Sequence, residues 1–205
     1  YTRTYTLSLH DALPILPNDY LPYDFDAYFK NPATFEMVTT NCLTGEAMYL
    51  VDKQDKQRTL DIVKASSSLP YVSKIVTVDG IPMLDGGIVD SIPVLRAIET
   101  GHPTNVVVLT RNRGYRNTSK DYKIPRFIYK KYPRLRVALS RRIAVYNAQL
   151  DLIEHLENEG KIVCIRPIHP LEVDRIERDV TKLEDLYEEG FEQGELFCQQ
   201  YWDKR

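Results

Sequence analysis

The stretch MLDGGIVDSIP, from Met83 to Pro93, places an acid and two glycines directly after a predicted strand. A carboxylate at a strand end could accept a proton from a serine hydroxyl, which is how a base activates a nucleophile. We expect Gly86 and Gly87 to allow positive φ angles and close backbone approach, so that the chain turns sharply beside Asp85. Asp-Gly pairs usually make turns, and on the motif alone that simpler interpretation is favoured.

Other residues with reactive side chains are expected to have structural roles. Ser66, Ser67 and Ser68 precede Pro70, and such a run is typical of the change from a helix to a strand. Asp90 fits a cap of the following helix better than a second catalytic acid.

The histidines show neither triad nor metal-ligand spacing. His102 follows a glycine that ends a predicted helix, and His169 lies next to Pro170. His155 has Asp151 four residues before it on a predicted helix, which indicates an exposed pair.

Composition places the chain among globular proteins with one domain, or one domain and an extension. It has 205 residues, 43% hydrophobic content and a formal net charge of −2, so the whole chain is not typical of a nucleic-acid binder. No apolar run reaches the roughly 18 residues that a membrane-spanning helix needs. Cys42, Cys164 and Cys198 are scattered and odd in number, which indicates buried free thiols and favours the cytoplasm.

Segments that predict strands alternate with segments that predict helices, which indicates an α/β sheet covered by helices. Two hairpins are expected at 34–51 and 73–87, the second with Asp79-Gly80 at its tip. The run NVVVLT predicts a buried parallel strand. The run KIVCIRP predicts a further strand. Helices are expected at 57–70, 91–102, 133–157 and 173–202. Asp90 or Ser91 could cap the second of them, and the last is amphipathic.

The segment from Ala65 to Gly101 resembles the patatin-like phospholipase family. That family has an A-S-x-x-x-P segment, a hairpin, a D-G-G motif and an N/D-x-[IL]-P that begins a helix. The chain has these in order as Ala65-Ser66 with Pro70, then Asp85-Gly86-Gly87, then Asp90-Ser91-Ile92-Pro93. The stretch VVVLTRNRGYR and the tail IRPIHPLEVDRIERDVTKLEDLYEEGFEQG are similar to the bacterial branch, which carries a C-terminal extension.

The resemblance implies a three-layer α/β/α sheet domain, incomplete at its N-terminus, with a helical C-terminal extension. The string YTLSLHDALPI resembles a translated sequencing adapter residue for residue, so we expect residues 1–15, with His10 and Asp11, to be foreign to the fold. Residues 16–160 would then be the C-terminal part of the hydrolase domain, and 161–205 the strand and helical extension.

By this resemblance the function is hydrolysis of lipid or carboxylic esters by a serine acyl hydrolase with a Ser–Asp dyad. Asp85 would be the dyad aspartate, and Gly86 and Gly87 would shape the backbone around it. Neither a cofactor nor a metal is expected. No G-x-S-x-G and no glycine-rich oxyanion loop occur in the sequence. In the family both precede the part that this chain resembles, so we expect the intact parent to be the hydrolase and these 205 residues alone to be inactive.

One strongly basic stretch leaves a second function open. Residues 111–142 hold 12 Lys and Arg against one acid, while the rest of the chain carries a net −13. Such a stretch could bind an anionic membrane or nucleic acid as a non-enzymatic module. The near-neutral chain favours pairing with its own acids instead, so we expect no nucleic-acid partner, and peripheral membrane contact stays open.

Overall fold

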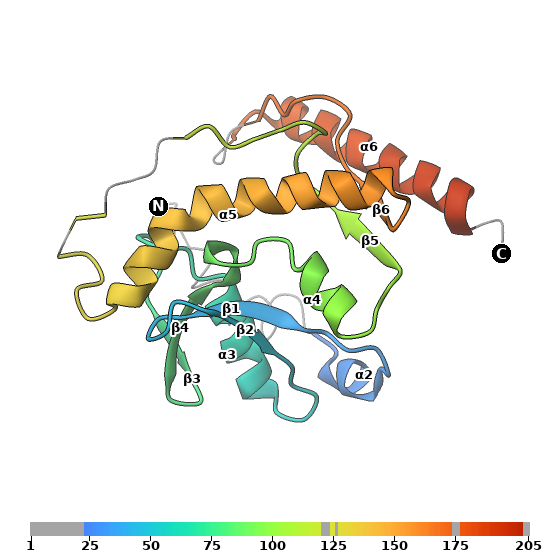
Figure 1. Ribbon diagram of the computed structural model, residues 1–205. Coiled ribbons are helices and arrows are strands. Elements are labelled where there is room, and N and C mark those ends of the chain that lie inside the picture. Colours follow the sequence, from blue (N-terminus) through green and yellow to red (C-terminus); the bar gives the residue numbers. More distant parts are fainter. Residues whose placement is uncertain (1–22, 120–123, 126, 174–176, 203–205) are drawn as a thin grey trace, which may run out of the picture. The chain divides into compact units, whose positions relative to one another are not determined.

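The computed structural model describes residues 23–119, 124–125, 127–173 and 177–202 (Figure 1). These residues form two compact units. The first unit holds the described residues of Tyr1–Ile92 and Ser119–Tyr146, and the second those of Pro93–Thr118 and Asn147–Arg205. The long helix α5 (Pro133–Asn158) contributes its first half to one unit and its second half to the other. The expected mixed α/β fold with a helical C-terminal region is confirmed.

A four-stranded antiparallel sheet forms the centre of the first unit, in the order β2-β1-β4-β3. Its strands are β1 (Met37–Asn41), β2 (Ala47–Leu50), β3 (Val76–Val78) and β4 (Ile81–Asp85). Both expected hairpins are present. Asp79 and Gly80 have φ angles of 51° and 78°, as a tight two-residue turn of this kind requires.

A helix covers each face of this sheet. The helix α3 (Lys56–Ser66) packs Ile62 and Ala65 against Met83 and its neighbours on one face. Leu84 points the opposite way, because successive side chains of a strand alternate, and it packs with Leu135 at the start of α5. Both sides of β4 are therefore buried where the strand approaches Asp85. The short helix α2 (Phe25–Lys30) precedes β1.

The second unit contains a parallel pair of strands, β5 (Asn105–Val108) and β6 (Ile162–Ile165). The expectation that β5 is a parallel strand is confirmed, but the expectation that it is buried holds for only one of its faces. Val106 and Val108 are 49% and 72% exposed, whereas Val107 between them is buried. In this structure β5 thus packs through one face, because alternate side chains point to opposite sides.

Two predicted helices differ in detail from the expectation. The helix α4 (Val94–Glu99) begins after Pro93 without a side-chain capping hydrogen bond, so neither Asp90 nor Ser91 caps it. The helix α6 (Val180–Phe197) begins several residues later than the apolar pattern indicated. Asp179 supplies its N-cap by accepting from the amide of Thr181, and the helix continues as a π-helical turn, Cys198–Trp202.

The apolar stripe of α6 is exposed to solvent along its length. The stripe consists of Val180, Leu183, Tyr187 and Phe191. Ile176, which continues the same spacing in the sequence, lies outside the described residues. Among described helices, none is long and apolar enough to cross a membrane.

Candidate active site

Asp85 is the last residue of β4, and its backbone is fixed on two sides. Its amide donates to the carbonyl of Ser68 at 3.0 Å, and its carbonyl accepts from Oγ1 of the buried Thr40 at 2.8 Å. In the sheet register Asp85 lies opposite Thr39 of β1. The main chain that carries the carboxylate is thus held by the neighbouring strand and by the segment after α3.

The carboxylate itself turns back onto the glycines. The amide of Gly87 donates to Oδ1 of Asp85 at 2.7 Å, which caps the short 3₁₀ turn η2 (Gly86–Ile88). Burial raises the pKa of Asp85, while the Gly87 hydrogen bond and the positive charge of Arg142 act in the opposite direction. A half-buried carboxylate with a raised pKa is a stronger base than a surface aspartate.

Of the two features expected at the glycines, the structure shows close backbone approach but not positive φ angles. Neither glycine is among the residues with positive φ, so the expectation of left-handed backbone at the motif is wrong. A Cβ on Gly86 would lie 2.4 Å from the carbonyl oxygen of Val38 in β1, so this position needs a residue without a side chain. A Cβ on Gly87 would lie 3.1 Å from Oδ1 of Asp85 and would crowd the carboxylate.

The loop after the motif is tied to the rest of the first unit. The carbonyl of Gly87 accepts from Ser91 Oγ at 2.9 Å and from Arg142 Nε at 3.0 Å. Oδ2 of Asp90 accepts from the hydroxyl of Tyr49 at 2.6 Å. Asp90 therefore anchors the loop to β2, and its expected role as a helix cap is not what the structure shows.

Sequence reasoning did not identify Arg142 as part of this site. It stands among the other cations of a long helix, and helical periodicity alone gives no indication that one of them meets the glycine loop. The sequence signal that could have found it is its position seven residues after the buried Leu135, on the same helical face.

The three serines at the end of α3 have the structural role that the sequence indicated. Their hydroxyls donate to backbone carbonyls: Ser66 to Val38, Ser67 to Val63, and Ser68 to Lys64. These bonds finish the helix and bind its end to β1.

The expected pair of His155 and Asp151 is not formed. Asp151 accepts from Arg116 at 2.5 Å, and His155 lies 3.4 Å from Glu159 instead. His102 is near the hydroxyl of Thr100, and the amide of His169 donates to Glu189. Within the described residues no three His, Cys, Asp or Glu side chains come together as a metal site would require.

The three cysteines are free thiols that differ in solvent exposure. Cys42 is buried and Cys164 is half-buried, and desolvation raises the pKa of these thiols to about 12 and about 11. Cys198 is exposed, so the expectation of three buried thiols holds for only part of the set.

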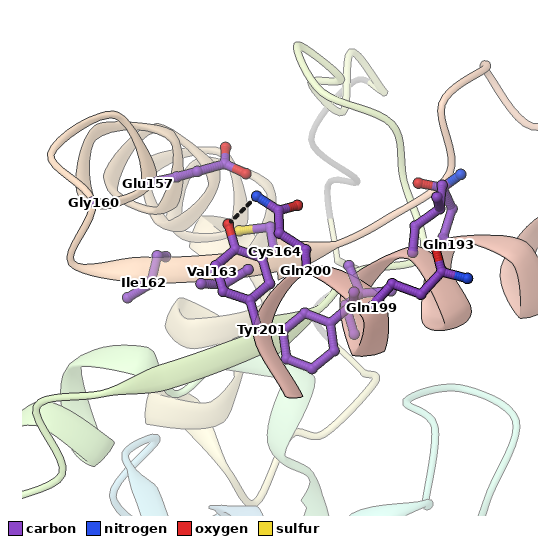
Figure 2. A pocket seen from close by; sticks show the side chains of 12 residues that line it. Glu157, Gly160, Ile162, Val163, Cys164, Gln193, Gln199, Gln200 and Tyr201 are labelled. Atoms are coloured by element: carbon purple, nitrogen blue, oxygen red, sulfur yellow. Dashed lines mark hydrogen bonds between the residues drawn. The ribbon is translucent and has the colours of Figure 1, made fainter. Parts of the chain in front are cut away.

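A pocket of about 650 Å³ lies in the second unit, between β6, the end of α5 and the C-terminal turn (Figure 2). Its walls include Glu157, Cys164 and Tyr201, and the amide of Gln200 donates to the Tyr201 hydroxyl at 3.1 Å. Asp85 is not among its lining residues. The pocket could not be predicted from the sequence, because its walls are mostly apolar and amide side chains.

Comparison with known proteins gives two family matches. Residues 20–98 match the patatin-like phospholipase family, which confirms the resemblance over the segment that contains the motif. Residues 132–203 match a domain of unknown function, DUF6363.

One curated relative is 46% identical to this chain over 56 residues, an uncharacterized protein of Escherichia coli (strain K12), YjjU. The aligned stretch covers 27% of this chain and 16% of that protein.

Proposed function

We propose that the intact protein is a serine acyl hydrolase of lipid or carboxylic esters, with Asp85 as the acid of a Ser–Asp dyad. The observation that carries the proposal is the placement of Asp85 within the patatin-like segment. It stands at the end of a strand, half-buried, with its backbone and carboxylate fixed by Thr40, Ser68 and Gly87.

The proposed chemistry is acyl transfer through an activated serine. The carboxylate of Asp85 takes the proton of the serine hydroxyl as its oxygen attacks the ester carbonyl, and that proton passes to the departing alkoxide. Water then attacks the acyl-enzyme and loses a proton to Asp85, and that proton passes to the serine oxygen as the carboxylic acid is released. Since the 205 residues contain no G-x-S-x-G, the serine belongs to residues outside this sequence, and these residues alone are expected to be inactive.

Hydrolysis of p-nitrophenyl butyrate by the full-length gene product tests this proposal. Asp85→Asn keeps the size of the side chain and removes the base, so kcat should fall at least about 100-fold. Asp61→Asn is the matched control, because Asp61 lies on α3 and accepts a hydrogen bond only from Gln57 in the described contacts. Normal turnover of Asp85→Asn, with unchanged melting, would remove Asp85 from the mechanism.

A second candidate function is peripheral binding to an anionic membrane. Part of the basic stretch is already used inside the protein, since Arg113 pairs with Glu157, and Arg116 pairs with Asp151 and Glu154. These pairs favour internal compensation for residues 111–116, as the chain's net charge indicated.

Two loops of the first unit support membrane binding by the rest of the basic stretch, after residue 116. They meet where the Tyr71 amide donates to the Tyr129 hydroxyl and the two rings lie 5.8 Å apart. Val72 and Phe127 are 77% and 78% exposed on these loops. The nearby cations Lys74, Lys130 and Lys131 are also exposed. Apolar side chains flanked by lysines suit the surface of a bilayer with anionic lipids.

Sedimentation with phosphatidylglycerol–phosphatidylcholine vesicles tests this second candidate. Binding should weaken steeply between about 50 and 500 mM salt, because added salt shortens the distance over which the charges attract each other. The double substitution Val72→Ser and Phe127→Ser should reduce binding about tenfold. Leu183→Ser, on the exposed face of α6, is the control. Binding that changes with neither salt nor the double substitution would contradict this second candidate function. A preference for nucleic acid over vesicles would also contradict it.

A further inference from the structure

The first half of α5 is packed directly against the candidate catalytic loop. Leu135 is fully buried with Leu84 and Ile88, the residues on either side of the Asp-Gly-Gly motif. The turn between β1 and β2 fixes the start of the helix, since a Cβ on Gly45 would lie 2.7 Å from the carbonyl oxygen of Arg134. The helix therefore has a defined position relative to Asp85.

Arg142 lies two turns further along the same face of α5. Its Nε donates to the carbonyl of Gly87 at 3.0 Å, while the amide of Gly87 donates to Oδ1 of Asp85 at 2.7 Å. Gly87 thus bonds to both groups: its carbonyl accepts from the Arg142 guanidinium, and its amide donates to the Asp85 carboxylate. The half-buried setting of both groups strengthens their interaction beyond that of a surface pair.

We infer that Arg142 is a positioning residue for Asp85, which fixes the Asp-Gly-Gly turn through Gly87 and places a positive charge beside the carboxylate. This inference rests on the proposed function, because it assigns Arg142 a part in the work of the dyad aspartate. It also gives a role to the beginning of residues 132–203, which match a domain of unknown function: Arg142 in that part supports the Asp-Gly-Gly turn.

The charge of Arg142 acts on more than one group. Burial raises the pKa of the Asp85 carboxyl and of the Tyr71 phenol, and the charge of Arg142 opposes both increases. Besides Arg142, the polar group that influences the Asp85 carboxylate among the described residues is the amide of Gly87. Asp90, the nearest acid in sequence, is engaged by the Tyr49 hydroxyl.

The experiment compares Arg142→Met, Arg142→Lys and the wild type in the full-length gene product. Without the guanidinium, the pKa of Asp85 should rise, so the acid limb of the kcat/KM profile should move to higher pH. Loss of the bond to Gly87 should also lower kcat by about 10- to 100-fold, with little change in KM. Arg142→Lys should restore the acid limb and only part of kcat. Arg141→Met, an exposed neighbour, is the matched control.

A second readout does not depend on turnover. The ¹³C resonance of the Asp85 carboxyl, assigned by comparison with Asp85→Asn, should titrate at higher pH in Arg142→Met than in the wild type. An unchanged titration and an unchanged acid limb would overturn the inference about Arg142. If Asp85→Asn retains full activity, the proposed function fails instead, and the carboxyl titration still decides whether Arg142 acts on Asp85.

Discussion

The amide of Gly87 lies 2.7 Å from Oδ1 of Asp85, so the second glycine of the motif holds the side chain of the acid that precedes it. The first glycine has a separate task. Gly86 passes so close to the Val38 carbonyl that no side chain fits between them. Gly87 therefore orients the carboxylate of Asp85. Gly86 allows the backbone at the end of β4 to pass close to β1.

We predict that Gly86→Ala destabilises the first unit strongly. Its Cβ would lie 2.4 Å from a backbone oxygen, and a strand cannot move aside as the end of a flexible side chain can. The expected cost is about 3 kcal/mol of unfolding free energy, measured by urea denaturation. Gly87→Ala, whose nearest contacts are side-chain atoms, should cost less and should instead lower turnover in the full-length protein. Equal stability losses for the two variants would contradict this division.

The local elements were predictable because their signals lie close together in the sequence. Asp79-Gly80 between two β-branched runs indicated a hairpin, and the apolar spacing of 57–70 indicated α3; both are present. The contacts of the site were harder to predict. Arg142 meets Gly87 across 55 positions, and Thr40 meets Asp85 across 45, and neither pairing leaves a periodic signal.

The sequence-based errors also have physical causes. The continuous run of valines in β5 predicted a buried strand, but a run without alternation cannot show whether a second face is covered. The pairing of His155 with Asp151 was inferred from helical spacing, and Arg116 from a distant loop binds Asp151 instead. A local rule failed there because a tertiary contact with a stronger ion pair was available.

We predict that the three thiols react at separable rates with a disulfide reagent such as DTNB. Cys198 is exposed and should react first. Burial raises the pKa of Cys164 to about 11, so little thiolate forms at pH 8 and its reaction should be slow. Cys42 is fully buried with a pKa of about 12 and should react only in denaturant. Cys198→Ser should abolish the fast phase alone; a fast phase that persists would contradict the assignment.

We predict that Glu154 stabilises the second unit in a pH-dependent way. The hydrogen bonds from Arg116 lower the pKa of Glu154 from its ordinary 4.5 to about 2. Because the folded-state pKa is depressed, the stabilisation is present above pH 4.5 and is lost as the pH falls toward 2. Allowing for partial exposure of the pair, Glu154→Gln should cost about 1–2 kcal/mol at pH 7.

Urea denaturation of the wild type and Glu154→Gln from pH 7 to pH 2 measures this contribution. The gap between their unfolding free energies should narrow as the pH falls, since the wild-type carboxylate then becomes protonated. Glu192→Gln, an exposed position on α6, is the control. A gap that stays constant across the range would show that Glu154 acts by packing and not by charge.

We predict that the two glycines inside α6 lower the stability of that helix and are not needed for close packing there. Gly190 and Gly194 lie inside Val180–Phe197, and nothing lies within 4 Å of a Cβ placed on either residue. Neither has a positive φ, so alanine fits the backbone at both positions. Because glycine loses more conformational freedom than alanine on entering a helix, each Gly→Ala change should stabilise α6 by about 0.5–1 kcal/mol. Hydrogen exchange of the α6 amides should slow by the corresponding factor. Unchanged or faster exchange in Gly190→Ala would contradict this prediction.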